Sequence, residues 1–243
     1  DSARGGALRD GVGDAACFDT PTGVAVAPDG TLYVSDTGHH RIRAVSLAGV
    51  VTTWAGGGEQ RLRDGARAAA AFSLPRGLAW GDDALYVADT GNDAVRRVTA
   101  AGVSTVMRDR YSPLGVSVDG NGRVYTTHGD GTLRATSGGT GPLAGTPREY
   151  TFADGEGADA RLNPGDGVAV LGGMVVFADT HNHRVRAYDP DTRRVRTLLG
   201  DGRAGADVLE GNARVTLPRG VAAWRDGFVV ADTGNHRVLY VRP

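Results

Sequence analysis

One phrase that occurs four times constrains the fold of this chain more than any other feature. Its clearest copy is Tyr-Val-Ala-Asp-Thr-Gly-Asn at residues 86–92, and the other copies begin at residues 33, 176 and 229. Their aspartates stand at positions 36, 89, 179 and 232, so both outer intervals are 53 residues and the middle one is 90. A long fixed period indicates a repeat architecture. Because the middle interval has room for two units, one of them degraded, the sequence predicts five repeats.

Each unit is predicted to form four short strands. In the first unit they cover residues 23–26, 31–35, 41–45 and 50–54, with turns rich in Gly and Asp between them. Short β-branched runs between such turns are typical of antiparallel hairpins. Large and small residues alternate along each first strand, as expected of a sheet that packs on both faces. We therefore predict an all-β, five-bladed β-propeller of four-stranded antiparallel blades.

The repeat runs through the chain without a linker, which predicts a single domain over residues 1–243. The fifth unit has no fourth strand after its third, and Gly5-Gly6 resembles the glycine-rich exit of a fourth strand. Residues 1–6 are therefore the candidate segment that completes the last blade and removes its exposed edge. The expected blades are 19–56, 73–107, 113–145, 163–200 and 217–243 plus 1–6.

Composition argues against several partners. The 27 basic and 28 acidic residues leave a net charge of −1, which provides no general attraction to nucleic acid or to an anionic membrane. No stretch approaches the roughly 18 apolar residues of a membrane span, so no membrane insertion is expected. Cys17 is the only cysteine, which excludes an intrachain disulfide. The absence of an initiator Met favours an extracytoplasmic protein or a domain excised from a larger one.

The units resemble the NHL repeat. The resemblance is carried by Pro-x-Gly-Val-Ala-Val, then Leu-Tyr-Val-Ala-Asp-Thr-Gly-Asn-His-Arg, then Val-x-Thr-x-Ala-Gly, read across the units. It covers the whole chain and is blurred in the third unit. The resemblance implies a propeller that serves as a binding platform, for proteins or RNA in tripartite-motif proteins and as an extracellular sensor in bacterial receptor kinases. The family also includes an amidating lyase with a zinc site in its channel, so the resemblance leaves the function open.

The repeated Asp-Thr-Gly-Asn-His turns are interpreted as architecture, because a feature found in nearly every unit serves the fold. We expect each Asp to bond backbone N–H groups two residues on and each Gly to take the left-handed position of the turn. His and Arg are expected to link neighbouring blades. Trp54, Trp80 and Trp224 are expected in the core between blades. The histidines do not have the spacing of metal ligands, so neither metal nor cofactor is predicted.

Candidate site residues are those at which the repeat breaks. The residue before each first-strand glycine should line the mouth of a central channel, where no particular side chain is needed for folding. The third unit has a short connecting loop and carries His in place of the repeated Asp, so its rim should be lowered and expose three side chains. Decay of an unneeded repeat is the alternative explanation. The predicted binding residues are Thr22, Arg76, Asp166 and Arg219 at the mouth, with Arg110, Tyr111 and His128 at the lowered rim.

These observations predict a monomeric, non-enzymatic module that binds a protein or a small polar or anionic ligand at the channel mouth. Arginine and tyrosine are favoured anchors at binding surfaces. One alternative is a metal-assisted lyase or hydrolase with His128 and Asp166 as acid–base groups. The other is RNA binding, against which the neutral charge and the scarcity of exposed aromatic residues argue. No catalytic residue is assigned.

Overall fold

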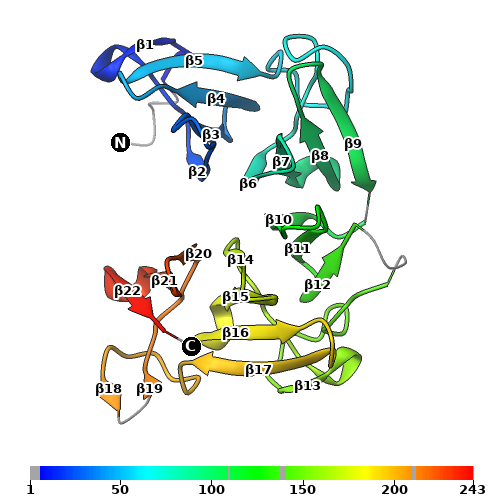
Figure 1. Cartoon of the computed structure of the whole chain (residues 1–243), viewed down its shortest axis with the longest axis vertical. Helices are drawn as coiled ribbons and strands as arrows, with labels where there is room; N and C mark the ends of the chain where they lie inside the picture. Colours follow the sequence, from blue (N-terminus) through cyan, green and yellow to red (C-terminus); the bar gives the residue numbers. More distant parts are fainter. Residues whose placement is uncertain (1–5, 109, 137–140, 210–211, 243) are drawn as a thin grey trace. The chain divides into compact units, whose positions relative to one another are not determined.

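The computed structural model describes residues 6–108, 110–136, 141–209 and 212–242. The chain divides into two compact units, residues 1–113 and 114–243, and each is described separately. Regular structure in the described residues consists of β-strands and five short 3-10 turns. This confirms the predicted all-β class. The main sheets are the five blades of a β-propeller fold, as the repeat predicted; Figure 1 labels their strands.

The first unit holds blades 1 and 2, which Figure 1 colours from blue to green. Blade 1 has the strand order β1-β5-β4-β3-β2 and blade 2 the order β6-β7-β8-β9. The strands of blade 1 are β1 (Gly11–Val12), β2 (Pro21–Val26), β3 (Leu32–Asp36), β4 (Arg41–Val45) and β5 (Val50–Ala55). Those of blade 2 are β6 (Pro75–Gly81), β7 (Ala84–Asp89), β8 (Ala94–Val98) and β9 (Val103–Arg108). The 3-10 turns are η1 (Gly13–Ala15) and η2 (Thr90–Asn92).

Blades 3, 4 and 5 belong to the second unit, apart from the first residue of β10. Blade 3 consists of β10 (Pro113–Val118), β11 (Val124–His128) and β12 (Thr132–Ala135). Blade 4 consists of β14 (Val168–Leu171), β15 (Met174–Asp179), β16 (Arg184–Asp189) and β17 (Arg194–Leu199), with β13 (Gly155–Glu156) outside β17. Blade 5 consists of β20 (Gly220–Trp224), β21 (Gly227–Asp232) and β22 (Arg237–Val241). The remaining elements are the hairpin β18 (Val208–Leu209) and β19 (Asn212–Ala213), and the 3-10 turns η3 (Gly157–Asp159), η4 (Thr180–Asn182) and η5 (Thr233–Asn235).

The number of strands differs between blades. Blade 2 has the predicted four, whereas blades 1 and 4 have five, because the segment that enters each of these blades pairs outside its fourth strand. Blades 3 and 5 show three strands in the part of the chain that the structure describes. Closure of blade 5 by residues 1–6 remains a prediction, because residues 1–5 lie outside the described residues. Gly6 contacts blade 1, where its carbonyl oxygen lies 2.8 Å from Nε2 of His39.

Apolar cores fill the space between consecutive blades within each unit. Between blades 1 and 2, the Tyr33 ring stacks on Trp80 at 5.2 Å and meets Trp54 at 4.4 Å, measured between ring centroids. The prediction of core positions is therefore confirmed for these two tryptophans. Trp224 ends β20 and is 54% exposed; its core position remains a prediction, because blade 5 packs only on blade 4 within its own unit.

Candidate functional site

The aspartate of the repeated phrase holds the loop that enters its blade. Asp36, Asp89, Asp179 and Asp232 have no exposed surface. In each, Oδ1 accepts a hydrogen bond at 2.7 Å from a backbone N–H 16 or 17 residues earlier in the chain; the donors are Asp19, Ser73, Asn163 and Thr216. The expected bond to an N–H two residues on is therefore wrong. A buried carboxylate needs several donors, and the entering loop supplies one.

The glycine of the phrase is needed for close approach and not for a left-handed backbone. The left-handed residues are His40, Asp93, His183 and His236, with φ between 51° and 56°. At Gly38, Gly91 and Gly234, an added Cβ would lie 2.3–2.5 Å from atoms of the entering loop. The predicted left-handed glycine is therefore wrong. The predicted linking role of histidine is confirmed, since Nδ1 of His40 and of His183 accepts an N–H from the loop that enters the next blade, at 3.1 and 3.2 Å.

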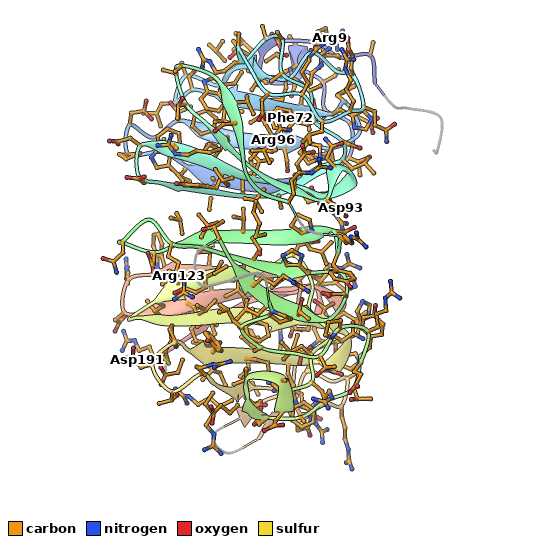
Figure 2. All side chains as sticks on the ribbon, turned by 90° about the vertical axis from the view of Figure 1, so that its right-hand side faces the viewer. Arg9, Phe72, Asp93, Arg96, Arg123 and Asp191 are labelled. Carbon is orange, nitrogen blue, oxygen red and sulfur yellow. The ribbon has the colours of Figure 1, made fainter. Side chains whose placement is uncertain are left out.

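A fully buried arginine completes the network in blades 1, 2 and 4. Arg96 in blade 2 donates at 2.6 Å to Asp89 and at 2.6 Å to Asp64 of the entering segment. Its guanidinium carbon lies 5.1 Å from the centre of the Phe72 ring, and Figure 2 shows the two side chains together inside the first unit. The equivalent arginines are Arg43 and Arg186. Burial raises the pKa of Asp89, although hydrogen bonds from Asn92, Ser73 and Arg96 partly offset it. These repeated polar groups bond one another, which supports their architectural role.

The predicted mouth residues adjoin in pairs. In the first unit Thr22 is exposed, and a Cβ added to its neighbour Gly23 would lie 2.1 Å from the carbonyl oxygen of Arg76. In the second unit a Cβ added to Gly167, the neighbour of Asp166, would lie 2.4 Å from the carbonyl oxygen of Arg219. The starts of consecutive inner strands are thus in contact within each unit, as the repeat implied.

The predicted rim residues of the third repeat differ in burial. Arg110 is exposed and Tyr111 is partly buried; both precede β10. His128 ends β11 and has no exposed surface, and its Nε2 lies 2.8 Å from Oγ1 of Thr126. The expected exposure of His128 is therefore wrong. The buried Arg134 of the same blade donates to Asp130 at 3.0 Å. In blade 3, Asp130 therefore pairs with the buried arginine in place of the repeated Asp, which this blade lacks.

Sequence reasoning missed a pocket at the other ends of the same strands. Its volume is about 650 Å³, and it lies at turns of blades 3 and 4 in the second unit. Figure 2 shows Arg123 and Asp191 along one edge of that unit. The lining residues are Asp119, Gly120, Asn121, Arg123 and Tyr125 from blade 3, with Val170, Gly173, Pro190 and Asp191 from blade 4. We call this site the turn pocket.

Hydrogen bonds and a ring contact connect the side chains on the blade 3 wall of the turn pocket. Oδ1 of Asp119 accepts the backbone N–H groups of Asn121 and Arg123, both at 2.9 Å. The Tyr125 hydroxyl lies 3.5 Å from Oδ2 of Asp119, and the Arg123 guanidinium carbon lies 5.1 Å from the centre of the Tyr125 ring. Burial raises the pKa of Tyr125, so its phenol stays protonated near neutral pH.

The turn pocket combines charges of both signs with a small apolar surface. The Arg123 guanidinium presents donors in a planar fork, and Asp191 adds an exposed carboxylate from the other wall. Val170 and Pro190 supply apolar contacts. A mainly preformed cavity with a few fixed polar groups is typical of small-molecule sites. Among the residues that the structure describes, no three His, Cys, Asp or Glu side chains are grouped to hold a metal ion.

Sequence signals for the turn pocket predict its turns but not that these turns lie together. Asp-Gly-Asn-Gly-Arg at residues 119–123 predicts a tight turn. Nothing local indicates that the turn containing Asp191 lies opposite, because that depends on how two blades pack. The described residues also contain no helix that is long and apolar enough to cross a membrane.

Comparison with known proteins identifies the repeat. The family model described as NHL repeat matches residues 18–44 and 216–239. The chain is 28% identical over 217 residues to the protein SUPPRESSOR OF QUENCHING 1, chloroplastic, of Arabidopsis thaliana, a match that covers 86% of this chain and 18% of that protein. It is 26% identical to NHL repeat-containing protein 2 of Bos taurus over 95% of this chain and 40% of that protein. The chain therefore spans less than half the length of these relatives.

Solved structures show the same fold at low sequence identity. An auxiliary nutrient binding protein from Bacteroides thetaiotaomicron matches with a TM-score of 0.62 and 17% identity, over 96% of this chain and 72% of that one. A chain from a nidogen/laminin complex matches with a TM-score of 0.66 and 16% identity, over 92% of this chain and 76% of that one. These likenesses concern the fold alone.

Proposed function

Because this chain carries NHL repeats on a five-bladed β-propeller fold, we propose that it is a non-enzymatic binding module that takes a small polar ligand in the turn pocket. The observation that carries the proposal is the set of contacts that join Asp119, Arg123 and Tyr125 on one wall of the pocket. Groups that are fixed before the ligand arrives lose little conformational entropy on binding. The fold neighbour described as a nutrient binding protein is consistent with such a use of the fold.

The charges of the turn pocket narrow the ligand class. The Arg123 guanidinium suits a carboxylate or another acceptor. The carboxylates of Asp119 and Asp191 suit hydroxyl or ammonium donors and would repel a multiply charged anion. The ligand class that fits is therefore a hydroxylated carboxylic acid or a zwitterion, with enough carbon surface to contact Val170 and Pro190.

The test is a thermal-shift screen of monosaccharides, sugar acids and amino acids at millimolar concentration, followed by calorimetry on any hit. Arg123→Gln should weaken a hit at least about tenfold, since a hydrogen bond to a charged group contributes about 1.5–3 kcal/mol. Arg203→Gln, which removes an exposed arginine outside the pocket, serves as the matched control and should leave the affinity unchanged. A screen without hits, or a hit that Arg123→Gln leaves intact, would reject the proposal.

The predicted mouth residues Thr22, Arg76, Asp166 and Arg219, with the exposed Arg110 and with Tyr111, remain a prediction for a separate binding site. The double variant Arg76→Ala/Arg219→Ala leaves every lining residue of the turn pocket unchanged. Binding that is lost in this double variant and kept in Arg123→Gln would assign the ligand to the mouth.

A further inference from the structure

One asparagine of the turn pocket differs from the other five in the residue that follows it. Asn121 is the only asparagine followed by glycine; it stands in the turn between β10 and β11 and lines the turn pocket. When an asparagine side chain cyclises, the nitrogen of the next residue attacks its carboxamide, and a side chain on that residue hinders the approach. Gly122 has no Cβ and leaves the approach open. Asn163 provides the opposite case, because Pro164 follows it and has no N–H.

Hydrogen bonds restrain the asparagines of the repeated phrase. Nδ2 of Asn92 donates to the buried carboxylate of Asp89 at 2.8 Å. Asn182 and Asn235 bond the repeated aspartates of their own blades in the same way, at 3.0 and 2.8 Å. A hydrogen bond to a charged group contributes about 1.5–3 kcal/mol. Each of these carboxamides must therefore give up a strong bond before it can react with the next residue.

The carboxamide of Asn121 has no such restraint. The residue is exposed, and in the described part of the chain its side chain makes no hydrogen bond. The nitrogen of Gly122 donates to the carbonyl oxygen of Asp119 at 3.0 Å, which closes the turn. Breaking such a neutral bond costs about 0.5–1.5 kcal/mol. The folded turn should therefore react slower than a free peptide by a factor of about 2–13.

We propose that Asn121 is a site of spontaneous deamidation, which converts a neutral residue of the turn pocket into a carboxylate. The nitrogen of Gly122 loses its proton and bonds to Cγ of Asn121; the bond from Cγ to Nδ2 breaks, and ammonia leaves with that proton. Water then adds to one carbonyl carbon of the cyclic imide, and the ring opens there. Opening at Cγ gives aspartate, and opening at the backbone carbonyl gives isoaspartate. One water is consumed, one ammonia is released, and nothing is oxidised.

The modification changes the charge of the turn pocket. Either product adds a third carboxylate to those of Asp119 and Asp191. This charge opposes an acidic ligand on Arg123, an effect that rests on the proposed function. Isoaspartate also lengthens the backbone by one carbon, within the turn where Asp119 holds the N–H groups of residues 121 and 123. Binding of an acid should therefore decline as the protein ages.

The test is incubation of the whole 1–243 chain in mildly alkaline buffer, followed by cleavage after arginine and mass spectrometry. The peptides 111–123, 77–96 and 226–237 report on Asn121, Asn92 and Asn235 separately. Peptide 111–123 from the folded chain should gain the mass difference between amide and acid at a rate within about 13-fold of that of the same synthetic peptide. Asn121 that is intact when the synthetic peptide is fully converted, or Asn92 that converts as fast, would overturn the proposal.

Variants separate the modification from its effect on binding. Asn121→Gln should stop the mass change, because the larger ring closes far more slowly. In calorimetry with gluconate as the probe acid, Asn121→Asp should bind up to about fivefold more weakly than the fresh wild type, and Asn121→Gln should bind equally well. Equal affinity of Asn121→Asp would overturn the effect on the pocket. Absence of gluconate binding in the wild type would reject that effect together with acid binding in the turn pocket, whereas the mass measurement needs no ligand and tests the modification alone.

Discussion

Blades 4 and 5 carry the same buried carboxylate and neutralise it in different ways. In blade 4, Arg186 has no exposed surface and bonds Asp179 at 2.6 Å and Asp154 at 2.7 Å. In blade 5 the corresponding position holds Leu239, and Arg237 reaches Asp232 through Nε at 2.7 Å while remaining 27% exposed. A buried carboxylate requires a paired cation because desolvation of an isolated charge is expensive. Both blades therefore place an arginine against the buried carboxylate, although the arginine stands at a different position of the repeat in each.

The turn after that carboxylate also differs between blades 4 and 5, in how closely the entering loop approaches it. Gly234 of blade 5 donates to the carbonyl oxygen of Thr216 at 2.8 Å, and an added Cβ would lie 2.5 Å from Cγ2 of Thr216. Blade 4 has His181 at this position, where the bond to the carbonyl oxygen of Asn163 is 3.3 Å. The longer bond indicates that the entering loop of blade 4 has withdrawn far enough to admit a side chain.

The threonine of the turn bonds different partners in blades 4 and 5 of the second unit. Oγ1 of Thr180 in blade 4 donates at 2.6 Å to the carbonyl oxygen of Pro218, which precedes the inner strand of blade 5. Thr233 of blade 5 is exposed, and its hydroxyl bonds the carbonyl oxygen of Ala231 in its own blade at 3.3 Å. Thr180 thus links two blades of the second unit, and the bond of Thr233 lies within its own turn.

The largest expected effect concerns the two arginines. Arg186→Met should lower the free energy of unfolding by about 3–5 kcal/mol, because it leaves a buried carboxylate unpaired. Arg237→Met should cost about 1.5–3 kcal/mol, since water reaches that site and the loss is mainly of charged hydrogen bonds. Urea unfolding followed by circular dichroism measures both values. Adding Asp179→Asn to Arg186→Met should recover part of the loss; equal costs for the two arginines would contradict the comparison.

The turn glycine should give the next largest effect. Gly234→Ala is expected to destabilise the protein by about 1–3 kcal/mol, because the new methyl group overlaps the entering loop. His181→Ala provides the matched change in blade 4 and should stay within about 0.5 kcal/mol, as expected of an exposed side chain. Thermal melting of both variants tests this pair. If Gly234→Ala left the melting temperature unchanged, the entering loop of blade 5 would be able to move away from the turn and make room for the methyl group.

The threonine pair should give the smallest difference. Thr180→Val removes a buried hydroxyl donor and leaves the Pro218 carbonyl oxygen without it, so a loss of about 1 kcal/mol is expected. Thr233→Val, on the exposed turn, should change stability by less than about 0.5 kcal/mol. The measurement is again the free energy of unfolding in urea. Similar costs would show that the contact of Thr180 with blade 5 contributes little.

Much of the fold could be predicted because its signals are local. The strand lengths, the Gly and Asp turns and the number of blades follow from a repeated phrase and the alternation of residues around it. The site was harder to predict. Thr22 and Arg76 adjoin as the repeat implied, but His128 is buried where a lowered rim was expected. A missing aspartate in the sequence does not show that another carboxylate, here Asp130, accompanies the arginine of the same blade.

The amino-acid sequence of this chain was sufficient for its all-β class, its NHL repeats and the division into five blades. Packing between segments settled the rest. Thr53 meets Asp10 across 43 residues of sequence, and the turn pocket joins Arg123 to a turn of the next blade at Asp191. Strand and turn preferences act over a few neighbouring residues, whereas the partners of a buried charge and the walls of a pocket are chosen by contacts between distant segments. Those contacts exist only once the blades have packed.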